Sequence, residues 1–131
     1  MKSGNLLNPA LSAAIASLGH TEYLVIADAG LPIPKGVEVI DLSLCRGVPA
    51  FLDAVKTVLA ELVVESYIYA SELPEQNSSV YTELQRNLAG IPGKAVPHTD
   101  FKRLVQSSRV VVRTGECSPY ANVILVGGVN F

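Results

Sequence analysis

The last two strand-like segments of the sequence limit the fold most strongly. Residues 109–113 and 122–126 are rich in β-branched Val and Ile, which is typical of buried β-strands. About eight residues join the two segments, whereas a crossover between parallel strands normally needs a dozen or more. The two segments are therefore expected to be antiparallel neighbours, and a sheet that contains them cannot be wholly parallel.

Helical and strand-like segments alternate over the preceding part of the chain. Asn8 and Pro9 form a good helix start, an N-cap followed by proline at the first helical position. Leu11, Ile15 and Leu18 then recur at helical spacing. By the same criteria, helices are expected at residues 9–18, 49–62, 78–88 and 100–107, and strands at residues 23–27, 37–41, 66–70 and 93–97. The alternation predicts a single layered α/β domain over residues 1–131, with helices packed on a mixed, mostly parallel sheet that has an antiparallel C-terminal strand pair.

The composition indicates which partners the chain has. Charged residues make up 17% of the chain, below the usual ~25%, and hydrophobic residues make up 49%. This is more apolar surface than a small monomer comfortably hides, so a homo-oligomer is expected. The net charge is −2 and the Lys and Arg residues are scattered, which disfavours nucleic acid and membrane surfaces as partners.

Neither a membrane segment nor a cysteine motif stands out. No apolar run approaches the ~20 residues that cross a bilayer, and Asn8 and Pro9 interrupt the N-terminal segment that would otherwise suggest a signal peptide. Cys45 and Cys117 lie far apart, with no CxxC or Cys/His cluster, so free thiols are expected in place of a zinc site or redox motif. A cytoplasmic protein without a bound metal is the expectation.

The polar residues most suited to chemistry stand in loops or at the ends of predicted elements, where rigid scaffolds display functional groups. They are His20, Asp28, His98, Tyr120 and Asn122. His20 and Asp28 flank the strand at 23–27, and a loop stiffened by two prolines follows Asp28. Each residue also has an ordinary structural explanation, such as a solvated histidine at a helix end or an aspartate that closes a turn. The sequence alone does not show whether these residues meet in space.

Three familiar enzyme patterns are absent. Ser118 does not stand in the GxSxG motif of a hydrolase, and ADAGLP after the first strand differs from the GxGxxG motif that holds dinucleotide phosphates. A glycosidase needs two suitably placed carboxylates, and the available ones show no decisive arrangement. These are Asp28, Asp41, Glu72 and Glu116.

Six segments, taken in order, resemble the D-ribose pyranase family. They are GHTEYLVIADAGLPIP, IDLSL, GVPAF, PHTDFK, RTGE and PYANVIL. The resemblance extends from Asn8 to the C-terminus and so covers nearly the whole chain. ADAGLP is similar to the ribose branch of the family, whereas the related fucose mutarotases carry a different sequence after ADA.

The resemblance implies an activity, an assembly and a set of site residues. The activity is isomerisation of D-ribose from the β-pyranose form to the β-furanose form that ribokinase uses in ribose catabolism, with no cofactor. The assembly is a cytoplasmic, ring-built homo-oligomer with sites near subunit contacts, a decamer being one candidate size. His20 is implied as the proton donor. Lys102, one helical turn after His98, is an additional candidate for sugar binding. The implied sugar-binding residues are Asp28, His98, Tyr120, Ala121 and Asn122.

The residue types suit this chemistry on their own terms. Opening a hemiacetal ring takes a proton from the anomeric hydroxyl and gives one to the ring oxygen, and reclosure through another hydroxyl reverses these steps. Histidine can both donate and accept a proton near neutral pH. Two alternatives remain open: a non-catalytic sugar-binding accessory protein of ribose uptake, and a structural or regulatory oligomer with a vestigial pocket.

Overall fold

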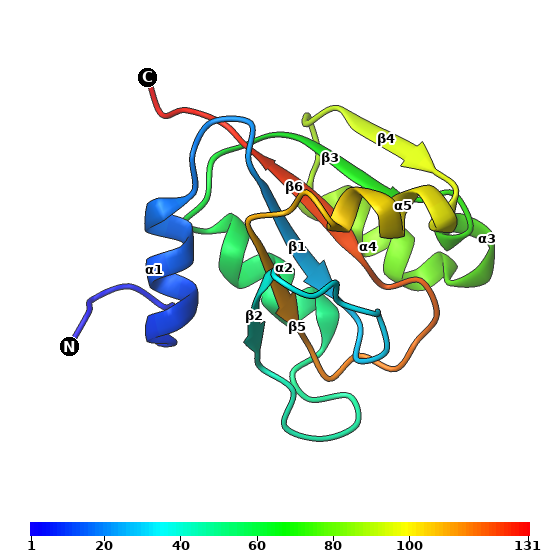
Figure 1. Cartoon of the computed structure of the whole chain (residues 1–131), viewed down its shortest axis with the longest axis horizontal. Helices are drawn as coiled ribbons and strands as arrows, with labels where there is room; N and C mark the ends of the chain where they lie inside the picture. Colours follow the sequence, from blue (N-terminus) through cyan, green and yellow to red (C-terminus); the bar gives the residue numbers. More distant parts are fainter.

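Eleven helices and strands follow one another along the chain, and the computed structural model describes all 131 residues. The helices are α1 (Pro9–Ser17), α2 (Phe51–Leu59), α3 (Leu73–Gln76), α4 (Ser78–Asn87) and α5 (His98–Val105). The strands are β1 (Tyr23–Ala27), β2 (Glu38–Asp41), β3 (Val64–Ala70), β4 (Gly93–Val96), β5 (Val110–Arg113) and β6 (Val123–Gly127) (Figure 1). Every predicted element is present within a few residues of its expected bounds, and α3 is an additional short helix. None of the helices combines the length and the apolar character needed to cross a bilayer.

The six strands form one mixed sheet in the order β2-β5-β1-β6-β3-β4. β2, β5 and β1 are mutually parallel, and β3 and β4 are parallel to each other. β6 lies between these two groups and runs antiparallel to both of its neighbours, β1 and β3. β6 therefore joins two parallel groups of strands into a single sheet.

The predicted fold class is confirmed, but the prediction that the last two strands are neighbours is wrong. β5 and β6 run in opposite directions as expected, yet β1 lies between them. Adjacent strands are about 4.8 Å apart, so the nine residues between β5 and β6 easily reach across one intervening strand. β1 is apolar along its length. Its position between β5 and β6 gives it a hydrogen-bonding partner on each edge.

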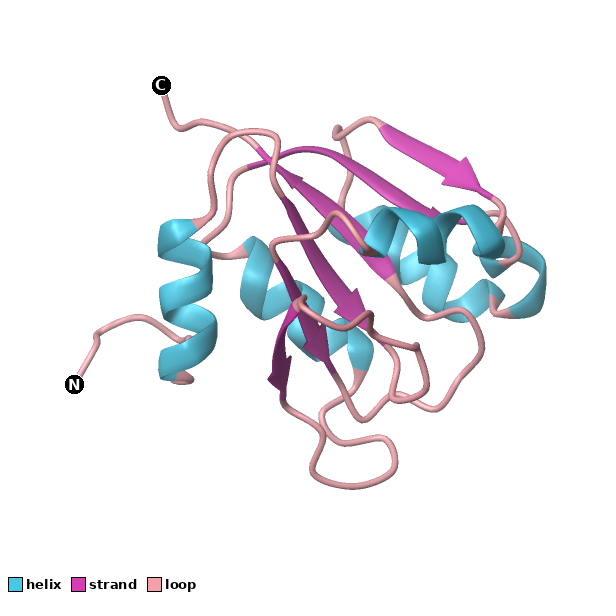
Figure 2. Cartoon of the chain, viewed as in Figure 1, coloured by secondary structure: helices cyan, strands magenta, loops and turns pink.

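Two hydrophobic cores lie on opposite faces of the sheet, because side chains alternate along each strand. In β1, Leu24 and Ile26 belong to the larger core, whereas Val25 and Ala27 belong to the smaller one, and all four are fully buried. Helices α1, α2 and α4 cover the larger core, and α5 covers the smaller one with Phe101 (Figure 2). The sheet is thus the middle layer of a three-layer domain.

The start of α5 differs from its predicted position. The helix was predicted at residues 100–107, but it begins two residues earlier, at His98, and Pro97 occupies the N-cap position without a side-chain bond. Glu72, which follows β3, accepts the His98 N–H at 3.0 Å instead. A carboxylate at a helix start is favoured because the free N–H groups there carry partial positive charge. The cap therefore comes from a distant part of the chain, which sequence spacing could not indicate.

Gly115, just after β5, lies against the loop that precedes α2. A Cβ at Gly115 would overlap the carbonyl oxygens of Val48 and Cys45, which belong to the backbone and cannot rotate away. We expect Gly115→Ala to lower the free energy of unfolding by about 2 kcal/mol, as overpacking typically does. Gly4→Ala is the matched control, because its Cβ would meet only the flexible Glu61 side chain. Urea denaturation measures both variants, and equal stability of the two would contradict the prediction.

Candidate functional site

Asp28 and Asn122 form a reciprocal pair at one end of the two central strands. Asp28 follows β1 and Asn122 precedes β6, and the antiparallel register places Ile26 opposite Val123. The Asp28 N–H donates to Asn122 Oδ1 at 2.8 Å, and Asn122 Nδ2 donates to Asp28 Oδ2 at 3.0 Å. The Gly30 N–H donates to the second carboxylate oxygen, Asp28 Oδ1, at 2.9 Å. These bonds hold the carboxylate in one orientation, and Asn122 itself is fully buried.

Tyr120 links His98 to this pair through its ring and its backbone carbonyl. The two rings meet edge to face with centroids 5.1 Å apart, and the His98 ring also lies parallel to Phe101 at 6.2 Å. Tyr120 has a φ of 57°, in the left-handed region, and its carbonyl accepts the Asn122 N–H at 2.8 Å. His98 Nδ1 is buried and has no hydrogen-bond partner in the chain. Because buried polar atoms are normally paired, this nitrogen is available to a ligand.

Glu72 fixes the backbone of His98. Its two carboxylate oxygens accept the His98 N–H at 3.0 and 3.2 Å, and the Ser71 hydroxyl donates to one of them at 3.0 Å. Burial alone would raise the pKa of Glu72, but these hydrogen bonds outweigh it and keep the pKa below its usual value of 4.5. Sequence reasoning did not select Glu72 for this site. Its position two residues after the predicted strand at 66–70 was the available signal.

Glu116 connects α2 to the loop that precedes β6. Its carboxylate accepts the N–H of Phe51, the first residue of α2, at 3.0 Å and the Ser118 hydroxyl at 2.8 Å. Burial alone would raise the pKa of Glu116, but the bonds from Phe51 and Ser118 outweigh it and hold the pKa below 4.5. The Glu116 carbonyl accepts the Ala29 N–H at 2.8 Å, which anchors the loop after Asp28. Glu116 is a second residue that sequence reasoning missed, although it stands in the RTGE segment.

A hollow of about 420 Å³ opens beside the Asp28 carboxylate. Its volume lies within the range of small-molecule sites. Two carboxylates and a hydroxyl stand on its wall and offer hydrogen-bond acceptors and a donor. The residues that line it are Asp28, Ala29, Gly30, Glu116, Cys117, Ser118 and Pro119.

His20 lies at the opposite end of β1 from Asp28. The five-residue strand between them spans about 16 Å. His20 Nε2 is 2.7 Å from Glu65 Oε2 on β3, and the His20 side chain is 53% exposed. Direct contacts link the other predicted residues to one another, and His20 stands apart from them. The residues brought together are Asp28, His98, Tyr120, Ala121 and Asn122.

The remaining sequence candidates contribute less. Lys102 lies one turn after His98 on α5 and is partly buried. Cys45 and Cys117 are free thiols, as the sequence predicted, and the structure shows both to be exposed. No group of three or more His, Cys, Asp or Glu side chains is arranged to hold a metal ion.

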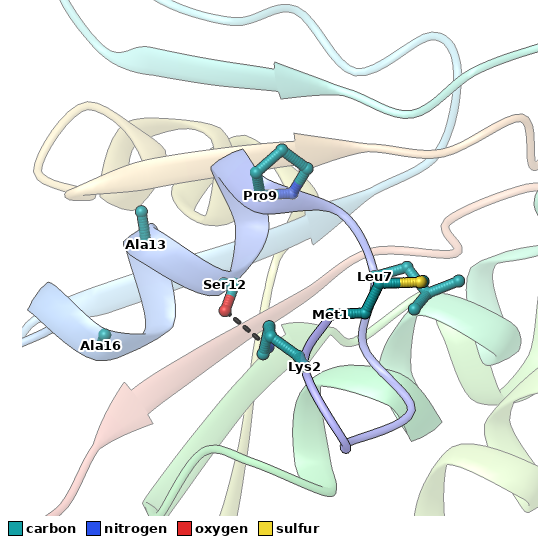
Figure 3. A pocket seen from close by; sticks show the side chains of 7 residues that line it. All are labelled: Met1, Lys2, Leu7, Pro9, Ser12, Ala13 and Ala16. Atoms are coloured by element: carbon teal, nitrogen blue, oxygen red, sulfur yellow. Dashed lines mark hydrogen bonds between the residues drawn. The ribbon is translucent and has the colours of Figure 1, made fainter.

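The largest hollow of the molecule, of about 570 Å³, lies away from these residues. Figure 3 shows it between α1 and the N-terminal segment, where Lys2 Nζ donates to Ser12 Oγ at 2.7 Å. Most of its wall is apolar, and it contains neither a carboxylate nor an imidazole. Lys2 is the one ionisable side chain on its wall, so we place the candidate site at the polar end of β1, where carboxylates and an imidazole lie. The lining residues are Met1, Lys2, Leu7, Pro9, Ser12, Ala13 and Ala16.

Comparison with protein families gives the class to which this fold and site belong. The model of the RbsD / FucU transport protein family matches residues 1–130, and the chain belongs to this family. Two curated relatives named D-ribose pyranase, from Laribacter hongkongensis and Symbiobacterium thermophilum, are each 53% identical to this chain over 131 residues. Each alignment covers all of this chain and all of the relative. The predicted family resemblance is thereby confirmed.

Solved structures agree with this assignment. The structure of Bacillus subtilis RbsD complexed with D-ribose matches over the full length of both chains, with 44% sequence identity and a TM-score of 0.97. The fucose mutarotase from Streptococcus pneumoniae, solved in complex with L-fucose, matches 95% of this chain and 94% of its own with a TM-score of 0.80. At 22% identity, the second match shows a shared fold only.

The Glu116 carboxylate gives the stability of the protein a defined pH dependence. Because folding lowers its pKa, the ionised group stabilises the folded state above about pH 4.5, and this contribution is lost as the pH falls below that value. Glu116→Gln removes the charge and is expected to lower the free energy of unfolding by about 1 kcal/mol near neutral pH. Urea denaturation of both proteins should show the difference shrinking between about pH 6 and about pH 3. A difference that grows on acidification would contradict this account.

Proposed function

We propose that this protein is a D-ribose pyranase, a cofactor-independent isomerase that interconverts the β-pyranose and β-furanose forms of D-ribose. Full-length relatives of this name are about half identical to the chain, and a ribose-bound relative has nearly the same backbone. The furanose product would supply ribokinase in ribose catabolism. The absence of a membrane-crossing helix is compatible with a cytoplasmic location for this activity.

The observation that carries the proposal is the fixed polar group around Asp28. A sugar offers several hydroxyls, each of which both donates and accepts a hydrogen bond, so a site for it needs oriented donors and acceptors. The paired Asp28 and Asn122 supply an oriented carboxylate, and His98 supplies a buried ring nitrogen without a protein partner. Tyr120 adds a ring that meets the His98 ring edge to face, and its hydroxyl can both donate and accept a hydrogen bond. In the proposal these residues, with Ala121, bind ribose.

The proton donor in this proposal is His20, and its distance from Asp28 requires a second copy of the chain. The two residues flank the same strand, about 16 Å apart, so one chain cannot place both on one sugar. A homo-oligomer in which His20 of one copy approaches Asp28 of the next would complete the site. The low charged fraction of 17% and the exposed apolar C-terminal Phe131 support such an assembly, for which we propose a ring.

Ribose exchange tests the proposed activity directly. Magnetisation transfer between the pyranose and furanose signals of ribose should accelerate with the wild-type protein. His20→Ala should reduce this acceleration by about 100-fold or more, the usual contribution of a general acid–base group. A protein that binds ribose without accelerating exchange would be a non-catalytic binding protein and would overturn the proposal.

Asp28→Asn tests the binding role separately. The variant keeps the side-chain shape but loses a charged acceptor, so ribose affinity should fall by about 10-fold in calorimetric titration. Asp53→Asn, at an exposed position in α2, is the control and should bind like the wild type. Equal affinity of the Asp28 and Asp53 variants would remove Asp28 from the binding site.

Mixed oligomers test whether two copies form each site. Co-expression of the His20→Ala and Asp28→Ala chains gives some contacts in which both native residues meet. Exchange activity should then exceed that of either variant alone. A mixture no more active than its parents, or a monomer mass in light scattering, would place each site within one chain.

A further inference from the structure

The loop that carries His20 is held tightly by its neighbours. The Thr21 N–H donates to the Gly127 carbonyl at 2.8 Å, and the Gly19 N–H donates to Glu22 Oε2 at 2.7 Å. Thr21 has a φ of 67°, which lies in the left-handed region and is unfavourable for a β-branched residue. Such conformations persist only where the surrounding structure enforces them, and they cluster at functional sites. The backbone around His20 is therefore fixed, and its ring needs only one further contact to fix its orientation.

Glu65 makes that contact from an irregularity in β3. Val64 pairs with Gly127 and Ser66 pairs with Val126, so Glu65 is an extra residue without a partner on β6, a β-bulge. Bulges change the direction of a side chain and are common beside active sites. At this bulge Glu65 Oε2 lies 2.7 Å from His20 Nε2.

Stability does not explain the His20–Glu65 pair. The side chains are 53% and 40% exposed, and exposed ion pairs contribute little to the stability of a fold. The loop around His20 is fixed, and a bulge in β3 directs Glu65 toward it. A surface ion pair needs neither of these features. The arrangement does serve to orient an imidazole.

We propose that Glu65 is a positioning residue that acts through His20. Its carboxylate accepts the Nε2–H of the imidazole, so that the ring keeps one orientation and Nδ1 becomes the nitrogen that exchanges a proton with the sugar. With the ring neutral, Nδ1 has a lone pair and accepts the proton of the anomeric hydroxyl. With the ring protonated, Nδ1–H donates to the ring oxygen. This inference rests on the proposed function and on His20 as its acid–base residue.

Substitution of Glu65 should lower the turnover rate more than it raises KM. Glu65→Ala removes the contact and is expected to reduce kcat for ribose exchange by about 10-fold, because a misoriented catalytic group loses rate without losing the sugar-binding residues. Glu65→Gln keeps an oxygen acceptor without the charge and should recover part of that loss.

Glu61 provides the matched control. It lines the same hollow of about 260 Å³ as His20, but its carboxylate pairs with Lys2 at 3.7 Å and makes no contact with the imidazole. Glu61→Ala removes the same charge and should leave kcat unchanged. Equal losses in the Glu61 and Glu65 variants would reduce the effect to general electrostatics and overturn the proposal.

A double variant separates positioning from a merely structural role. If Glu65 acts only through His20, the variant with both His20→Ala and Glu65→Ala should be no slower than His20→Ala alone. Multiplied losses would overturn the proposal. The wild-type activity keeps the two hypotheses apart, since no exchange by the wild type refutes the proposed function, whereas an active wild type with fully active Glu65 variants refutes only the positioning role.

The imidazole tautomer gives an independent readout. Long-range proton–nitrogen spectra distinguish Nε2–H from Nδ1–H rings. The chain has only two histidines, so the signal set that is lost in His20→Ala belongs to His20 and the remaining set belongs to His98. In the wild-type protein at a pH where the ring is neutral, His20 should carry its proton on Nε2. A proton on Nδ1 would contradict the proposed contact.

Discussion

β6 is the strand on which the rest of the sheet depends. It hydrogen-bonds to β1 on one edge and to β3 on the other, and no other strand connects the two parallel groups. All five of its residues are buried, so each face of the strand contributes apolar area to one of the two cores. β6 therefore holds the two parallel groups together in one sheet. Its antiparallel direction also determines where the residues at its two ends lie.

The two ends of β6 organise the two polar regions of the molecule. At its start, Asn122 exchanges hydrogen bonds with Asp28, and the turn before it brings Tyr120 to His98. At its end, the Gly127 carbonyl accepts the Thr21 N–H. A Cβ at Gly127 would crowd the loop that joins α1 to β1. One rigid strand thus separates the proposed sugar-binding residues from the proposed proton donor. Within a repeating assembly, such a separation allows one copy to complete the site of another.

The sequence predicted local structure well where the signals are local. Asn8 caps α1 by accepting the Leu11 N–H at 2.9 Å, as the Asn-Pro start indicated. The start of α5 was displaced by two residues because its capping carboxylate, Glu72, lies 26 positions away in the sequence. β5 was wrongly predicted to lie beside β6. The length of a connection limits the relative direction of two strands, but it does not decide which strands are neighbours. Glu116 was missed for a related reason, since its partner Phe51 is distant in sequence.

By itself, the sequence determined the fold class, the order and type of the predicted elements, and the family, because apolar periodicity, turn residues and ordered motifs are all written along the chain. It also selected His20, Asp28, His98 and Tyr120 to Asn122 as candidate site residues, without showing which of them meet. Only the tertiary structure decided that His98 and Tyr120 join Asp28 and Asn122 at one end of β1, away from His20, and that Glu65 faces His20 from a bulge. Both facts depend on strand order and register, which long-range packing selects and which no local pattern records.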